Sequence, residues 1–309
     1  KVEQVGEDRV YVSDCRGSSP PSTHKVCVNT LGAYKQSIEV LLTGLDIEKK
    51  AEIYVDQIFH NLGGKEQFTD VDIHLIRSDK EDPASNEEAH AALRITITSD
   101  DPSKLGRLLQ AKVTELGLAA IPGNPGRGAA GYNGSPVIAY WPTLIDSRKV
   151  TERVHIDGDL IEVLPTQRLG LEERYYQEVP VKIPPAPGGD TTRIPFGRLF
   201  GTRSGDKGGA ANCGVWAKTD EAFGFLHEFL TVEKFKELAP DMASYKIERF
   251  DLPNLRALNF YIHDVLGEGV SSNHRIDKQA KSLCEYLRAK TIEAPTLLVD
   301  QIARTNLNE

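Results

Sequence analysis

Residues 203–215, RSGDKGGAANCGV, form the stretch with the most side chains suited to chemistry. Its four glycines permit positive φ angles and let the backbone approach a ligand closely. Successive N–H groups in such a turn form an anion site, and Arg203 and Lys207 add positive charge. We therefore expect a loop that binds a phosphate or carboxylate group. The alternative is a tight hairpin turn with a solvated salt bridge.

This glycine-rich stretch is expected to share one cleft with two later regions, the turn at residues 253–254 and the segment after His263. A cleft of this kind combines cations for an acidic group with amides for orientation. Asn259 has a second interpretation as a core amide satisfied by the backbone. The predicted substrate-binding residues are Arg203, Gly205, Lys207, Gly208, Asn212, Asn254 and Asn259.

The predicted catalytic residues are Ser204, Asp206 and His274. Asp206 and His274 supply a carboxylate and an imidazole for acid–base chemistry. Ser204 needs a base within reach to act as a nucleophile, so a triad of the three residues is one hypothesis, although it has no spacing signature. Asp206 with His263, Asp264 and His274 offers metal ligands in no recognised pattern, so no metal site is predicted.

Two α+β units must position these residues. In the first, apolar periodicity predicts the order strand, helix, strand, strand, helix, strand, a split βαβ arrangement. The predicted elements cover residues 25–29, 46–62, 68–76, 93–98, 101–116 and 136–141. A second glycine-rich stretch, residues 122–135, precedes the last strand, and Arg127 is its only charge.

The second unit follows a proline- and glycine-rich linker at residues 165–193. Its predicted strands cover residues 196–202, 212–217, 245–250 and 258–263. Its predicted helices cover residues 223–238 and 277–287. The fold class is therefore α+β, with two ferredoxin-like βαββαβ-type units whose antiparallel sheets are covered by helices. The predicted domains are residues 1–164 and 194–309.

Two blocks carry a resemblance to a known family. RSGDKGGAANCGV and FDLPNLRALNFYIHDVLGEGV, at residues 250–270, resemble the C-terminal ferredoxin-like domain of the acyclic terpene utilisation protein A (AtuA) family. Residues 2–164 resemble the latter part of the family's large N-terminal region, most clearly at VEQVGEDRVYVSDCRGSSPPSTHKVCV. The family usually has Ile where this chain has Cys213, which argues against an essential thiol and favours a buried one.

The sequence begins at Lys1, and the family's upstream segment does not precede it. We therefore expect a fragment, a processed product or one half of a split protein, with the missing N-terminal portion or a partner subunit completing it. A homo-oligomer is also expected.

Composition narrows the class of protein. A formal net charge of −8 argues against nucleic-acid binding. No membrane span or signal segment is recognisable, so a cytoplasmic location is expected. Four cysteines without a CxxC pair suggest neither a disulfide scaffold nor structural zinc, and reduced, mostly buried thiols are expected.

The resemblance implies a metabolic enzyme or enzyme component that acts on acyl-CoA esters or branched carboxylic acids of acyclic terpenoid degradation. Hydratase or lyase chemistry on a CoA thioester substrate is one form of this hypothesis, and no cofactor is identified. The alternative is a non-catalytic module for assembly with a partner subunit. A polar cleft with perturbed titrating groups favours the first hypothesis, and a flat apolar patch over the sheet favours the second.

Overall fold

The computed structural model describes residues 1–15, 21–119, 121–124, 134–163 and 182–306. The chain divides into two compact units. The first combines residues 1–28 and 141–182, and the second combines residues 29–140 and 183–309. Arg127 and most of the predicted linker at 165–193 lie outside the described residues.

The first unit contains two β-hairpins. Strands β1 (Val2–Gly6) and β2 (Arg9–Val12) form one hairpin, and β7 (Glu152–Ile156) and β8 (Asp159–Val163) form the other. Asp157 and Gly158 connect β7 to β8 with φ angles of 50° and 92°. Positive φ at both positions is what a two-residue hairpin turn of this hand requires.

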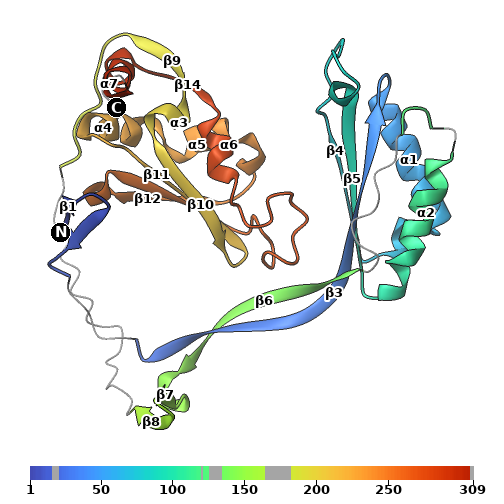
Figure 1. Cartoon of the computed structure of the whole chain (residues 1–309), viewed down its shortest axis with the longest axis horizontal. Coiled ribbons are helices and arrows are strands. Elements are labelled where there is room, and N and C mark those ends of the chain that lie inside the picture. Colours follow the sequence, from blue (N-terminus) through green and yellow to red (C-terminus); the bar gives the residue numbers. More distant parts are fainter. Residues whose placement is uncertain (16–20, 120, 125–133, 164–181, 307–309) are drawn as a thin grey trace. The chain divides into compact units, whose positions relative to one another are not determined.

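The second unit begins with the predicted split βαβ arrangement, and Figure 1 shows α1 and α2 on the same face of its sheet. The sheet order is β4-β5-β3-β6, in which β5 pairs antiparallel with both β3 and β4. β3 is far longer than the predicted strand at 25–29. The elements in chain order are β3 (Thr23–Thr43), α1 (Ile47–Asn61), β4 (Asp70–Ile76), β5 (His90–Ser99), α2 (Arg107–Gly117) and β6 (Ser135–Asp146).

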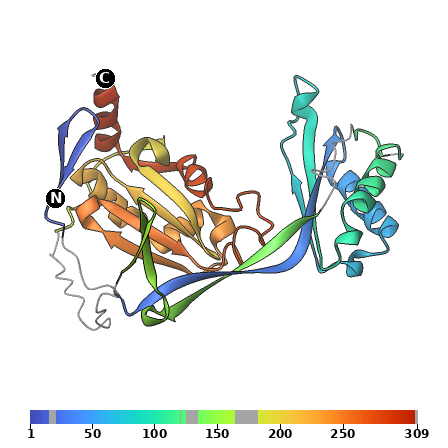
Figure 2. The ribbon, with the colours of Figure 1, turned by 60° about the horizontal axis from the view of Figure 1, so that its bottom comes forward.

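Alternation along these strands separates an apolar face from a polar one. Ile38, Leu93 and Ile95 are buried in one core with Tyr54 and Ile58 of α1. Residues that alternate with these core residues along each strand, such as Arg94 between Leu93 and Ile95, point to the opposite face of the sheet. That face is free of α1 and α2, and Figure 2 shows both helices on the other side.

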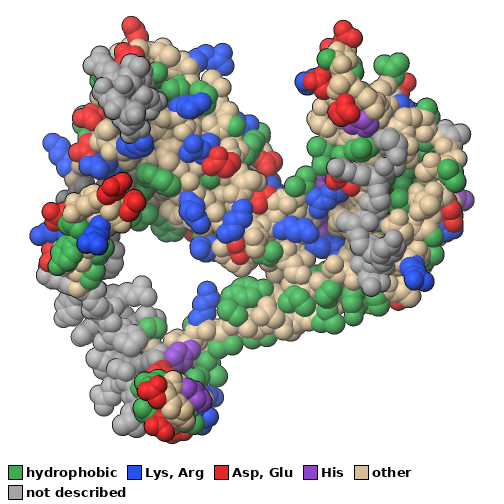
Figure 3. All heavy atoms as spheres, viewed as in Figure 1, with side chains coloured by type: hydrophobic (Ala, Val, Ile, Leu, Met, Phe, Trp, Pro, Cys, Tyr) green, Lys and Arg blue, Asp and Glu red, His purple; other side chains and the backbone are tan. Residues whose placement is uncertain are grey.

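The long strands β3 and β6 also expose large apolar side chains. Val28 and Leu31 on β3 and Trp141 and Leu144 on β6 are all exposed to solvent. Figure 3 shows apolar side chains along this two-stranded part of the sheet. Scattered apolar residues are normal on a protein surface, whereas a contiguous run marks a surface that can bind another molecule.

The rest of the second unit is built on a four-stranded antiparallel sheet in the order β10-β11-β13-β12 and a two-stranded sheet of β9 and β14. The α+β class with antiparallel sheets is confirmed. The strands are β9 (Thr191–Pro195), β10 (Gly201–Lys207), β11 (Ala210–Trp216), β12 (Ile247–Leu252), β13 (Ala257–Ile262) and β14 (Thr291–Pro295). The helices are α3 (Phe196–Leu199), α4 (Asp220–Phe229), α5 (Val232–Leu238), α6 (Leu283–Arg288) and α7 (Thr296–Asn306).

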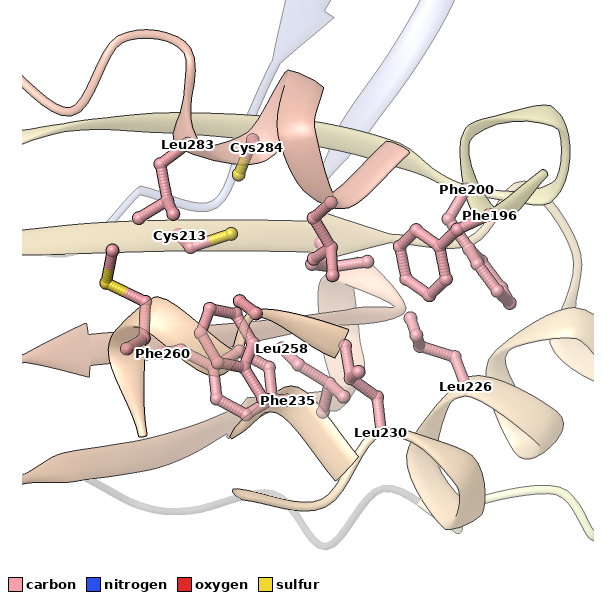
Figure 4. Packing of buried hydrophobic residues seen from close by; sticks show 14 of the residues in the cluster. Phe196, Phe200, Cys213, Leu226, Leu230, Phe235, Leu258, Phe260, Leu283 and Cys284 are labelled. Carbon is pink, nitrogen blue, oxygen red and sulfur yellow. The ribbon is translucent and has the colours of Figure 1, made fainter. Parts of the chain in front are cut away.

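Helices cover one face of this sheet and enclose a second core. Phe260 stacks on Phe235 with ring centroids 4.7 Å apart (Figure 4). Cys213 and Cys284 meet in the same core, and their hydrogen bond, followed by burial, raises the pKa of the Cys213 thiol. Cys213 is therefore a buried thiol as predicted, whereas Cys15 and Cys27 are exposed.

The glycine-rich stretch forms a hairpin of two antiparallel strands. The predicted strand at 196–202 is replaced by α3 and the start of β10, and residues 203–207 belong to β10. Gly208 and Gly209 form the turn to β11, with a φ of 63° at Gly208. The stretch has the hairpin shape of the alternative because alternate residues of β11, namely Ala211, Cys213 and Val215, are buried in the core and hold it extended.

Two predicted helices also differ. The helix expected at 223–238 is divided into α4 and α5, because the Thr231 hydroxyl accepts a hydrogen bond from the Lys234 N–H and starts a new helix. The last predicted helix begins at Leu283 rather than at Asp277. The Asp277 carboxylate instead accepts hydrogen bonds from the N–H groups of Lys281 and Ser282, which holds a turn before α6.

Candidate functional site

Four of the predicted binding residues share one face of the β10-β11-β13-β12 sheet. Arg203 lies opposite Gly214, which in turn lies opposite Asn259, and Gly205 lies opposite Asn212. Residues that pair directly point to the same face. The Asn212 side-chain amide donates to Asn259 Oδ1 at 3.2 Å, so Asn259 is satisfied by a side chain.

The other predicted residues of the hairpin have different surroundings. Ser204 lies on the core side, where its hydroxyl accepts a hydrogen bond of 3.0 Å from the Cys284 N–H at the start of α6. Asp206 lies 3.9 Å from Lys281 Nζ. Asp206 and Gly208 line a cavity of about 400 Å³ together with Ser271. Ser204 therefore has a structural hydrogen bond.

Lys207 and Asn254 lie near opposite ends of the same sheet. Lys207 is exposed and ends β10 at the hairpin turn. Asn254 lies in a 3₁₀ turn, Pro253–Leu255, between β12 and β13. That turn adjoins Ala257, which pairs with Trp216 at the far end of β11. The sheet therefore separates these two predicted binding residues.

His274 lies against the first sheet. Its Nε2 is 3.1 Å from Thr98 Oγ1, and its Nδ1 is 3.3 Å from Asp70 Oδ2. Only 17% of the His274 side chain is exposed, and burial holds its pKa below the ordinary value. Among the described residues, no hydrogen bond or ion pair joins His274 to Ser204 or Asp206. The three predicted catalytic residues are thus not brought together.

Residues 264–282 include His274 and contact the polar face of the first sheet. They are called the 264–282 segment below. Lys35 of β3 donates from Nζ to the Ser271 carbonyl at 2.6 Å and to the Asn273 carbonyl at 2.9 Å. Arg94 of β5 donates to the His274 carbonyl at 3.0 Å. These contacts fix the backbone at His274 and in the residues just before it.

Lys35 is an unusual group on this face because it is buried. Burial first, and then the charges of Lys278 and Arg94, lower the pKa of Lys35 to about 8. Its hydrogen bonds go to carbonyl groups rather than to a carboxylate. A buried cation next to an imidazole is typical of functional sites, although structural networks also produce it.

One cavity beside the segment is largely apolar. It has a volume of about 440 Å³, and Leu75 and Ile76 of β4 line it together with Leu266 and Leu283. Its charged lining residues are Asp241, Arg275 and Asp277, with His74 beside them. Arg275 pairs with Asp241 at 2.9 Å. This combination suits a ligand with an apolar chain and an acidic or polar end.

A third cavity, of about 530 Å³, is lined in part by His274. Asp70 and Thr98 line it with His274, and Asp100 and Glu268 add two further carboxylates. The charged residues that line this cavity are carboxylates apart from His274, and Ala33 and Val137 add apolar surface.

The site residues predicted from the sequence do not include Lys35, Asp70, Arg94 or Thr98. A signal was present within the predicted strands at 68–76 and 93–98. Polar residues occupy every second position there, at Asp70, Asp72 and His74 and at Arg94, Thr96 and Thr98. An exposed sheet face has the same alternation, so this pattern alone does not identify a site.

Neither a metal cluster nor a spanning helix is found in the part of the chain that the structure describes. No group of three or more His, Cys, Asp or Glu side chains there is placed to hold a metal ion. Within those same residues, every helix is too short or too polar to cross a membrane.

The fold and the cavities define an α+β chain with two antiparallel four-stranded sheets and ligand-sized cavities along the 264–282 segment. Residues 1–156 match the family model described as acyclic terpene utilisation family protein AtuA, and residues 194–293 match the AtuA ferredoxin-like domain. The chain belongs to this AtuA family, and its membership indicates a function related to terpene utilisation. Comparisons with curated proteins and with solved structures gave no significant match.

Proposed function

We propose that this protein is an enzyme, or a component of one, that acts on acyl-CoA esters or branched carboxylic acids formed when acyclic terpenes are degraded. Family membership supports the metabolic setting. The observation that carries the proposal is the apolar cavity lined by Leu75, Ile76 and Leu266, with Arg275 among its lining residues. A branched hydrocarbon chain suits such walls, and a guanidinium suits a carboxylate or phosphate.

The size of the cavity agrees with this substrate class. Its volume of about 440 Å³ falls within the range of roughly 300–1,000 Å³ that is usual for small-molecule sites. Arg275 is already paired with Asp241. A ligand carboxylate would therefore either share the Arg275 guanidinium with Asp241 or displace Asp241 from it. In this arrangement the apolar walls would contact the acyl chain, and the Arg275 cation would bind the polar end of the ligand.

Ligand binding tests the proposal through a thermal-shift titration with geranyl-CoA, short-chain acyl-CoAs and CoA alone. A ligand that binds only the folded protein raises the melting temperature by mass action. We expect the largest rise with geranyl-CoA, because only its chain fills the apolar cavity.

Two matched variants locate the site. Ile276 and Leu255 are each 66% exposed, but only Ile276 lines the cavity. Ile276→Trp should abolish the rise by filling the cavity mouth, and Leu255→Trp should retain it. Equal rises in all three proteins, or no rise with any acyl-CoA in folded wild-type protein, would contradict the proposal.

A second candidate function is assembly with a partner subunit or as a homo-oligomer. Trp216, Phe250 and Leu252 are 42%, 49% and 41% exposed. They lie on neighbouring rows of one sheet face, because Trp216 and Leu252 both pair with Ala257, and Phe250 pairs with Asn259. An exposed apolar patch of this kind favours a binding surface. Light scattering on wild-type protein and on Trp216→Lys distinguishes this function, because only assembly through the patch predicts a loss of mass in the variant.

A further inference from the structure

The Asp70, His274 and Thr98 side chains form a connected series at the cavity of about 530 Å³. Asp70 Oδ2 lies 3.3 Å from His274 Nδ1, and His274 Nε2 lies 3.1 Å from Thr98 Oγ1. The three residues come from β4, the 264–282 segment and β5, and all three line the same cavity. A hydroxyl, a base within reach of it and a third group that orients the base are the components of nucleophilic catalysis.

From this arrangement we infer that Thr98, His274 and Asp70 form an acyl-transfer site that hydrolyses esters or thioesters. The preference for thioesters rests on the proposed function, whereas the reacting groups do not depend on it. Thr98 is the nucleophile, His274 is the general base and acid, and Asp70 orients the imidazole. None of the residues predicted from the sequence to be catalytic belongs to the site except His274.

The chemistry of the two partners determines the roles of the two ring nitrogens. An ionised carboxylate can only accept hydrogen bonds, so Asp70 favours the tautomer with hydrogen on Nδ1. Nε2 is then free to accept the Thr98 hydroxyl proton. This is the tautomer that a general base needs at that position.

Burial, more than the surrounding charges, keeps His274 neutral near pH 7. Burial is the largest cause of its lowered pKa. Lys35 of β3 and Arg94 of β5 also lower it, whereas Asp70 and Asp72 of β4 raise it. The backbone at Ser271, Asn273 and His274 is fixed by Lys35 and Arg94, so the position of the ring is determined by groups other than its catalytic partners.

The reaction is balanced with water as the second substrate. Thr98 Oγ1 attacks the acyl carbon and forms a C–O bond while its proton moves to Nε2 of His274. The C–S bond of a thioester, or the C–O bond of an ester, then breaks, and Nε2 gives the proton to the leaving thiol or alcohol. Water attacks the acyl-Thr98 ester, its proton passes through Nε2 back to Oγ1, and a carboxylic acid is released.

The cavity also limits the substrate. Asp100 and Glu268 line it in addition to Asp70. Three carboxyl groups disfavour an anion inside the cavity, because like charges repel. We therefore expect the uncharged acyl part of the substrate to enter it, and an uncharged ester is the appropriate probe.

The test measures hydrolysis of p-nitrophenyl butanoate by the full chain, with butanoyl-CoA hydrolysis followed by release of free thiol. Thr98→Val keeps the size of the side chain and removes the hydroxyl, and we expect a rate loss of about 100-fold or more. Thr98→Ser should retain a rate within about tenfold of wild type. His274→Gln should resemble Thr98→Val, and Asp70→Asn should lower the rate less than either.

Thr96→Val is the matched control. Thr96 lies on the same face of β5, two residues away, and its hydroxyl contacts Ser37 at 2.9 Å. If the contacts of His274 only hold the segment in place, Thr98→Val and Thr96→Val will have similar rates and the inference is wrong. A butanoyl group on the Thr98 peptide by mass spectrometry supports it.

Absence of hydrolysis also decides the question. Folded wild-type protein that releases neither p-nitrophenol nor CoA thiol overturns the acyl-transfer site. If geranyl-CoA still raised the melting temperature of that protein, and Ile276→Trp abolished the rise, the proposed function would remain supported. The two proposals therefore fail separately.

Discussion

Two hydroxyl groups illustrate how surroundings determine the role of a residue. The Ser204 hydroxyl is buried and accepts the Cys284 N–H, which would otherwise lack a partner within the second core. The Thr98 hydroxyl lines a cavity and contacts an imidazole. Removing the Ser204 hydroxyl would leave the buried Cys284 N–H unpaired and lower the stability of the fold. The Thr98 hydroxyl lies at a cavity instead, where it is available for chemistry.

The charge on His274 gives a prediction at the residue scale. The folded-state pKa of His274 lies below the ordinary 6.5. As the pH falls, the imidazole is therefore protonated in the unfolded chain before it is protonated in the folded protein. As the pH falls from about 7 through 6.5 toward the folded-state pKa, the folded state therefore loses stability. We expect wild type to lose more unfolding free energy than His274→Gln between pH 7 and pH 5.

Urea unfolding of both proteins at several pH values measures this difference. Hydrolysis should follow the same ionisation, because only neutral His274 accepts the Thr98 proton, and its rate should rise with pH below 6.5. Parallel stability curves for wild type and His274→Gln would show that the ring titrates as in the unfolded chain.

At the scale of elements, the hairpin of β10 and β11 supports the 264–282 segment. The Gly209 carbonyl accepts a hydrogen bond of 2.8 Å from the Leu266 N–H. A Cβ at Gly209 would lie 2.0 Å from the Gly267 carbonyl oxygen. The glycine is therefore required because two backbone stretches approach each other closely.

Gly209→Ala should displace the start of the segment and lower the free energy of unfolding by about 1–3 kcal/mol, a usual cost of overpacking. Gly188→Ala is the control, since a Cβ there has no atom within 4 Å. Hydrogen exchange should increase at residues 264–282 in Gly209→Ala alone. Unchanged exchange and stability would indicate that the hairpin does not support the segment.

At the scale of the whole molecule, the described residues form two separate hydrophobic cores. One lies between α1, α2 and the first sheet, and the other lies between the helices and the β10-β11-β13-β12 sheet. Ile95 belongs to the first core and Phe260 to the second, and both are fully buried. Separate cores of this size can unfold as separate cooperative units.

We expect Ile95→Ala to destabilise the first core by about 2–5 kcal/mol and Phe260→Ala to destabilise the second by about 3–5 kcal/mol. Hydrogen exchange by mass spectrometry assigns each loss to its peptides. Ile95→Ala should change protection mainly in residues 29–119, and Phe260→Ala mainly in residues 194–300. A uniform loss of protection in either variant would show that the two cores unfold as one cooperative unit.

Much of the fold was predictable because it depends on local patterns. The apolar spacing in residues 46–62 and 101–116 predicted both helices of the first sheet, and alternation predicted β4 and β5. The hairpin of residues 203–215 was predicted only as an alternative, because glycine permits a ligand loop and a tight turn equally. Local propensity could not decide the backbone shape, whereas the core packing of Cys213 and Val215 holds the stretch as a hairpin.

The sequence by itself determined the α+β class, the order of elements in the first sheet and the two faces of each strand, because these follow from spacing between near neighbours. Only the tertiary structure placed His274 beside Thr98, a contact between residues 176 positions apart. It also gave His274 partners other than Ser204 and Asp206. The physical reason is that side-chain spacing specifies which face a residue occupies, whereas the partner on that face depends on how distant parts of the chain pack.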